Sequence, residues 1–164
     1  MLKKWSFRVM LVLAVAIMVS GLASCSSSND GNPQTAVKQV MVDVQVAGDT
    51  VIIPLNEVTE KLNTRFNLVT EEGDMTFMAY ILDGKPYLRA DICPPCRSRS
   101  FTLTESTLVC DACGTVFDAA TGKGISGACV AYPKQSAPYQ LLGESIVVSQ
   151  ASLAAAYKDT LKPN

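Results

Sequence analysis

The chain has 164 residues, of which 48% are hydrophobic and 18% are charged, so it has room for one folded domain with a hydrophobic core. Its formal net charge of -1 gives no electrostatic reason to expect a nucleic-acid partner. Histidine is absent, which excludes Ser-His and Cys-His nucleophile pairs and metal or haem sites that need a histidine ligand. Any metal or redox chemistry therefore depends on the six cysteines.

The first residues have the features of a bacterial lipoprotein signal peptide. Three cations precede an apolar run over 9–19, which is about half as long as the ~20 residues that span a bilayer. Leu22-Ala23-Ser24-Cys25 then resembles a lipobox, the alternative being a plain secretory signal with an incidental cysteine. The resemblance implies cleavage before Cys25 and lipidation of that cysteine, so 1–24 is predicted to be a signal peptide. We therefore expect a cell-envelope protein, anchored to a membrane by its lipid and lying outside the cytoplasm.

The segment after the lipobox is polar and predicts a flexible tether over 25–36.

Residues 37–164 are then predicted to form one domain, whose first half has strand patterns. Valines alternate with other residues over 40–46, which is typical of a half-buried strand. A second strand is predicted over 51–53, where Pro54 ends the pairing. Two more strands are predicted over 66–69 and 75–82.

Short turns between apolar segments predict three hairpins. Asp83-Gly84 is the strongest hairpin signal in the chain and leads into a strand over 85–92. The other two hairpins join 101–103 to 107–110 and 139–142 to 145–148.

The C-terminal residues predict a helix. Ser149 is a suitable N-cap, and Leu153, Tyr157 and Leu161 repeat every four residues after it. The sequence therefore predicts a mostly β protein, namely a small antiparallel β domain with a peripheral C-terminal helix.

Four of the cysteines form two C-x2-C pairs. Cys93 and Cys96 flank two prolines, and Cys110 and Cys113 follow after 13 intervening residues. Two such pairs can bring four thiolates to one point, each pair on a tight turn and the turns joined by a hairpin. Gly114 permits the backbone that such a turn often needs. The pattern predicts a hairpin-borne four-cysteine metal site.

Four interpretations of these pairs remain open. Four thiolates suit a structural Zn2+ site, and they equally suit an iron–sulfur cluster or a single iron. Two structural disulfides would suit an oxidising envelope. A thiol–disulfide oxidoreductase would need Cys93 or Cys110 exposed with a lowered pKa, and the residues after Cys96 lack the helical pattern of such enzymes.

Cys129 is left over if the other four cysteines share one site. It is a candidate ligand of the same metal, a ligand of a second one, or a redox partner of the four cysteines. The alternative is a small buried hydrophobic residue with no chemical role.

Charged residues surround the cysteine pairs. We expect Asp91, Asp111 and Asp118 to accept backbone hydrogen bonds in turns. Arg97 and Arg99 could offset the negative charge of a four-thiolate site, but we expect them to be solvated surface charges.

Three segments together resemble the FtrD-like family of iron–sulfur membrane proteins, which is linked to bacterial ferrous-iron uptake. The segments are Asp91-Ile92-Cys93-Pro94-Pro95-Cys96, Leu108-Val109-Cys110-Asp111-Ala112-Cys113-Gly114-Thr115-Val116-Phe117 and Gly127-Ala128-Cys129. Upstream, Ile53-Pro54-Leu55 and Phe77-Met78-Ala79-Tyr80 also match family segments, so the likeness covers about 50–149. The resemblance implies that Cys93, Cys96, Cys110 and Cys113 are cluster ligands and that Cys129 belongs to the same motif.

A second resemblance concerns 110–122, which is similar to the second Rieske box with cysteine in the position of histidine. Because an all-cysteine ligand set is more electron-rich than a mixed cysteine–histidine set, a [2Fe–2S] centre here should have a lower potential than a Rieske centre.

These observations lead to three functional hypotheses. The first is a lipid-anchored carrier of single electrons with an iron–sulfur or four-cysteine iron centre, whose partner by family resemblance is an iron permease or another membrane redox protein. The second is a non-catalytic interaction module that Zn2+ stabilises, and the third is a thiol oxidoreductase. We expect an electron carrier or binding protein rather than an enzyme with its own substrate.

Overall fold

The computed structural model describes residues 35–70 and 73–164, which belong to one compact unit spanning Gln34–Asn164. The predicted signal peptide, the lipidation site Cys25 and most of the predicted tether lie outside the described residues. Ala36, the last residue of that tether, already pairs with Thr104 in a sheet. Neither helix in the described part of the chain combines the length and the apolar character needed to cross a membrane.

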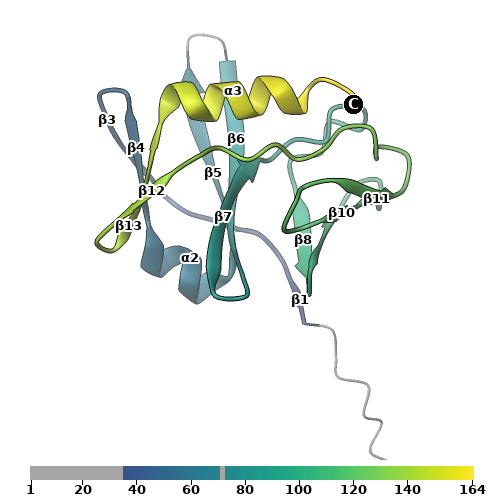
Figure 1. The fold of residues 1–164 in the computed structure, drawn as a ribbon, viewed down its shortest axis with the longest axis horizontal. Coiled ribbons are helices and arrows are strands. Elements are labelled where there is room, and N and C mark those ends of the chain that lie inside the picture. Colours follow the sequence, from purple (N-terminus) through teal and green to yellow (C-terminus); the bar gives the residue numbers. More distant parts are fainter. Residues whose placement is uncertain (1–34, 71–72) are drawn as a thin grey trace, which may run out of the picture. The chain divides into compact units, whose positions relative to one another are not determined.

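The described residues form three small sheets and two helices (Figure 1). The first sheet has the order β1-β8-β9-β10-β11, the second β12-β13-β4-β3 and the third β2-β5-β6-β7. The pairs are antiparallel except for β2 and β5, which run parallel. The predicted fold class, a mostly β protein with antiparallel sheets and a C-terminal helix, is confirmed. The elements are β1 (Ala36–Val37), β2 (Val40–Met41), β3 (Gln45–Ala47), β4 (Thr50–Pro54), α2 (Leu55–Lys61), β5 (Asn63–Thr70), β6 (Gly73–Leu82), β7 (Lys85–Ala90), β8 (Phe101–Thr104), β9 (Thr107–Cys110), β10 (Val116–Asp118), β11 (Gly124–Ser126), β12 (Gln140–Leu142), β13 (Ser145–Ser149) and α3 (Gln150–Thr160).

Strand β6 lies between two hydrophobic cores, because its side chains alternate between the two faces of its sheet. Phe77 and Ala79 belong to a core shared with β4, β13 and α3. Met78 and Tyr80 belong to a second core, which also contains Cys93, Cys110 and Cys129. The cysteines are therefore part of a packed core and not of an isolated surface loop.

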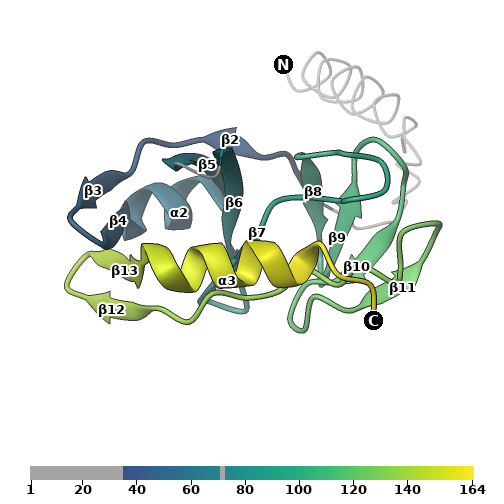
Figure 2. The ribbon, with the colours of Figure 1, turned by 90° about the horizontal axis from the view of Figure 1, so that it is seen from above.

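Helix α3 packs across β6, β7 and β13 (Figures 1 and 2). As predicted, the Ser149 hydroxyl accepts a hydrogen bond from the Ser152 N–H, at 3.1 Å. Leu153 is fully buried and the Tyr157 ring lies 5.9 Å from that of Phe77. Leu161 is 45% exposed because the helix ends one residue before it, so only two of the three predicted apolar positions face the core.

Two local predictions were wrong. The strand predicted over 40–46 is divided between β2 and β3, which pair in different sheets. Val42 is buried, as the pattern predicts, whereas Val40 and Val46 are exposed. Helix α2 was not predicted, since it has seven residues and buries only Val58. Pro54 does end β4, and α2 begins at the next residue.

Candidate metal centre

Two tight turns carry the C-x2-C pairs. The first follows β7, where the Cys93 N–H donates to the Ser98 carbonyl at 2.8 Å and closes the turn that contains Cys96. The second follows β9, where the Gly114 N–H donates to the Cys110 carbonyl at 2.9 Å. Gly114 has a φ of +68°, the left-handed backbone expected from the sequence.

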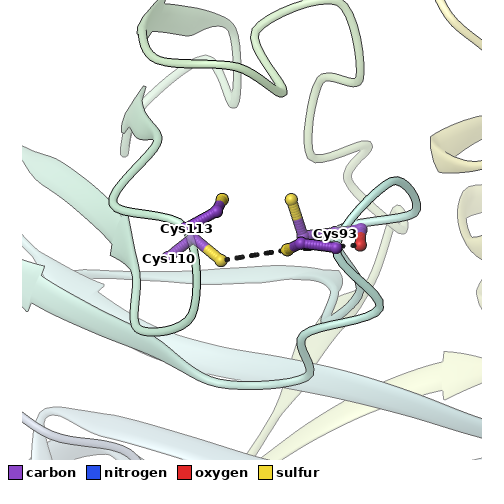
Figure 3. Close-up of side chains that lie close together, drawn as sticks. Cys93, Cys110 and Cys113 are labelled. Carbon is purple, nitrogen blue, oxygen red and sulfur yellow. Dashed lines mark hydrogen bonds between the residues drawn. The ribbon is translucent and has the colours of Figure 1, made fainter.

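The four predicted ligands, Cys93, Cys96, Cys110 and Cys113, come together. Their sulfur atoms all lie within 4.8 Å of one another, and the Cys96 and Cys110 sulfurs are 3.7 Å apart. Figure 3 shows Cys93 on one turn and Cys110 and Cys113 on the other, with their side chains directed into the space between the turns. All five cysteines in the described residues are free thiols, so the structure contains no disulfide between these pairs.

The spacing of the sulfurs fits a single metal ion. A metal–sulfur bond of about 2.3 Å places the corners of a tetrahedron about 3.8 Å apart, which is close to the 3.7 Å between the Cys96 and Cys110 sulfurs. Four thiolates are also the ligand set of iron–sulfur clusters. The donor set therefore fits iron or zinc.

Cys129 lies beside the four-cysteine group but outside it. Its sulfur is 3.7 Å from that of Cys113, and its N–H donates to the Thr115 hydroxyl at 3.1 Å. Gly127 makes this approach possible, because a Cβ there would lie 2.7 Å from Thr115 Cα and the φ of +108° also favours glycine. The glycine of the Gly-x-Cys motif thus allows a close backbone contact, which places a fifth thiol beside the other four.

The thiols differ in burial and in acidity. Cys93 and Cys110 are buried, and this burial raises the pKa of each. Cys113 is half-buried; its burial would raise the pKa, but hydrogen bonds from the Thr115 hydroxyl and backbone N–H lower it to about 6. The oxidoreductase hypothesis required Cys93 or Cys110 to be exposed with a lowered pKa, and neither condition is met.

A buried lysine next to the cysteines was not predicted. Lys134 is fully buried, and its ammonium lies 4.6 Å from the centroid of the Phe117 ring. Burial lowers the pKa of this lysine, whereas Cys93, Cys110 and Cys129 raise it. Lysine is almost never fully buried, so nothing in the sequence marked this position.

The neighbouring charged residues follow the predictions in part. Asp118 accepts the Thr121 N–H at 2.7 Å, in a turn as expected. Asp111 instead accepts side-chain hydrogen bonds, from the hydroxyls of Ser100 and Thr102 and from Lys38. For Asp91 the prediction was wrong, because both carboxylate oxygens are buried without a hydrogen-bond partner. Arg97 and Arg99 are exposed, as expected.

Of the comparisons with known proteins, the family model agrees with a site of this kind. Residues 58–159 match the family model described as "Membrane iron-sulfur containing protein FtrD-like". No curated protein matches the chain. Among solved structures, a chain of the "Complex of reduced oxygenase and oxidized ferredoxin in carbazole 1,9a-dioxygenase" has 20% sequence identity and a TM-score of 0.44, over 53% of this chain and 81% of that chain.

Proposed function

Because the chain belongs to the FtrD-like family of membrane iron–sulfur proteins, we propose that it is a lipid-anchored, extracytoplasmic carrier of single electrons. Cys93, Cys96, Cys110 and Cys113 hold the metal in this proposal. The observation that carries it is the convergence of four thiols within 4.8 Å in a chain of an iron–sulfur family. Iron held by four thiolates accepts and releases one electron.

The residues around the thiols support this role. Cys93 and Cys110 are shielded from water, while Cys96 and Cys113 reach the surface in part. Electrons can therefore be exchanged with a docked partner through the half-buried pair, while the buried pair excludes solvent. The proposed centre is an iron–sulfur cluster or a single iron, and the proposed partner is an iron permease or another membrane redox protein.

Metal analysis of the full chain tests the proposal. The protein would be purified without oxygen, in detergent, from cells supplied with iron, and its iron, zinc and acid-labile sulfide would be measured together with its visible spectrum. We expect iron and a charge-transfer band that bleaches on reduction, both lost in Cys110→Ser. Cys129→Ser should keep the band, because Cys129 lies outside the four-cysteine group. Labile sulfide in proportion to iron would indicate a cluster in place of a single ion.

A zinc-stabilised interaction module is the second candidate, favoured by the same spacing of the sulfurs. It predicts one zinc per chain, no visible band and unfolding by a chelator, because structural zinc binding contributes directly to folding. That result would contradict the electron-transfer proposal.

Lipid anchoring at Cys25 is a separate part of the proposal. Mass spectrometry of the mature protein should find an acylated cysteine as residue 1 of the processed chain. The Cys25→Ala variant should lose the acyl mass and remain unprocessed. A mature protein that begins at another residue and carries no lipid would contradict the anchor but leave the metal centre untouched.

A further inference from the structure

Lys134 is the one ammonium that the core around the cysteines encloses among the described residues. Its side chain has 0% exposure, and Nζ lies 4.6 Å from the centroid of the Phe117 ring and 5.5 Å from that of Phe101. Both rings belong to the hydrophobic core that contains Cys93, Cys110 and Cys129. Contact with two aromatic faces compensates part of the lost hydration but not all of it.

Within the described residues, the ammonium donates its hydrogen bond to a neutral group next to the metal centre. Nζ donates to the Ile92 carbonyl at 2.6 Å, one residue before Cys93. No carboxylate within residues 35–70 and 73–164 forms an ion pair with Lys134. A buried charge without a counter-charge is costly, so an anionic group is expected close to it.

The backbone holds Lys134 firmly in this position. Its N–H donates to the Gly122 carbonyl at 2.8 Å, and its own carbonyl accepts from Arg89 Nη1 at 2.7 Å. A Cβ on Gly122 would lie 2.1 Å from the Lys134 carbonyl oxygen, so glycine is required for this approach. These backbone contacts therefore fix the position of Lys134 in the core.

The cysteines of the metal centre are the strongest anionic groups that act on this ammonium, ahead of the buried Asp91 carboxyl group. Four thiolates around a divalent ion carry a net charge of -2, and Cys93 and Cys110 are the two of these groups whose charge acts most strongly on Lys134. We propose that Lys134 is the counter-charge of the metal centre and raises its reduction potential. This inference rests on the proposed function for its redox part. Uptake of one electron from a donor makes the centre more negative by one charge, and a fixed positive charge stabilises that state.

Redox titration of the iron-loaded full chain tests the inference. Lys134→Met removes the charge and keeps the length of the side chain. At the midpoint potential of the wild type, we expect the ratio of reduced to oxidised protein to fall at least tenfold, which is 59 mV for a one-electron couple. Arg97→Gln is the matched control, since it removes an equal charge beside Cys96 at an exposed position and should change the ratio less than twofold.

Two further variants separate charge from structure. Lys134→Arg keeps the positive charge and should stay near the wild-type potential. Lys134→Gln keeps a donor for the Ile92 carbonyl but not the charge, so it should behave like Lys134→Met. If Lys134→Gln instead has the wild-type potential, or if Lys134→Met does not change it, the counter-charge role is wrong. Circular dichroism of each variant establishes that the comparison is made on folded protein.

A zinc-loaded arm makes the test independent of electron transfer. Competition with a chelator should show at least tenfold weaker zinc retention in Lys134→Met and wild-type retention in Arg97→Gln. If the protein contains zinc and no iron, the proposed function fails while this arm still decides the role of Lys134. Equal zinc retention in Lys134→Met and the wild type would overturn the counter-charge role.

Discussion

Gly127→Ala should break the contact that brings Cys129 to the metal centre. Gly127 has a φ of +108°, and a Cβ there would lie 2.7 Å from both Cα and Oγ1 of Thr115. The backbone conformation alone costs an alanine about 1–3 kcal/mol. Overpacking against backbone atoms adds about 1–3 kcal/mol. We therefore expect the free energy of unfolding to fall by about 2–6 kcal/mol.

Gly143→Ala is the matched control. Gly143 also has a positive φ, of +58°, but a Cβ there would have nothing within 4 Å. The substitution therefore carries only the left-handed backbone penalty, roughly 1–2 kcal/mol. The difference between the two variants therefore contains the contact between Gly127 and Thr115 together with the larger backbone penalty at Gly127.

Urea unfolding of the metal-free, reduced protein measures both variants, and alkylation of Cys129 reports whether its segment has moved away. Gly127→Ala should expose Cys129, which is only 2% exposed in the folded protein, and Gly143→Ala should not. Equal destabilisation by the two alanines, with Cys129 still protected in both, would refute the reasoning that this close contact positions the fifth thiol.

Three further predictions concern acidity and packing. Burial raises the pKa of Asp91 from 3.8 to about 7. Because the unfolded chain releases this proton at a lower pH than the folded protein does, the free energy of unfolding falls as the pH rises from about 4 to about 7. In urea titrations, Asp91→Asn should remove that fall and stabilise the metal-free protein at pH 8 by up to about 4 kcal/mol. In the metal-free protein, Cys113 should be the first cysteine to react with iodoacetamide at pH 7, and its reaction rate should decline as the pH drops through about 6. Mass spectrometry of the labelled peptides measures this order, and faster labelling of Cys93 would contradict it. Leu153→Ala should lower the free energy of unfolding by about 2–5 kcal/mol, whereas Leu161→Ala should change it by less than about 0.5 kcal/mol, because only Leu153 is fully buried.

Local turn chemistry made much of the fold predictable. Asp83 and Gly84 have φ values of +50° and +73°, which is the left-handed pair that a two-residue hairpin needs. The Ser149 cap likewise depends on neighbouring residues only, and α3 begins directly after it. The two C-x2-C turns are also local, so their meeting through the hairpin of β8 and β9 could be expected from spacing.

Long-range pairing decided what could not be predicted. Val40 and Val46 alternate with their neighbours as in one strand, yet β2 pairs with β5 and β3 pairs with β4. Which partner a short strand finds depends on residues far along the chain, and periodicity does not contain that information.

The environment of the cysteines was the other unpredictable part. Lys134 reaches the core because the chain after Cys129 folds back onto the turn at Gly122. Glycines in and beside strands often mark close backbone approach, so Gly122 and Gly127 were the available signal. The partner segment that approaches them could not be identified from the glycines alone.

The four thiols are unequally buried, which has a consequence for the order in which they would bind a metal ion. An ion that arrives from solvent meets Cys96 and Cys113 first, and the low pKa of Cys113 makes it a thiolate at neutral pH without help from the metal. Cys93 and Cys110 give up their protons only when the ion is already close, since burial disfavours their charged forms. We therefore expect an ion to bind the outer pair before the inner pair, and a chelator to remove it in the reverse order.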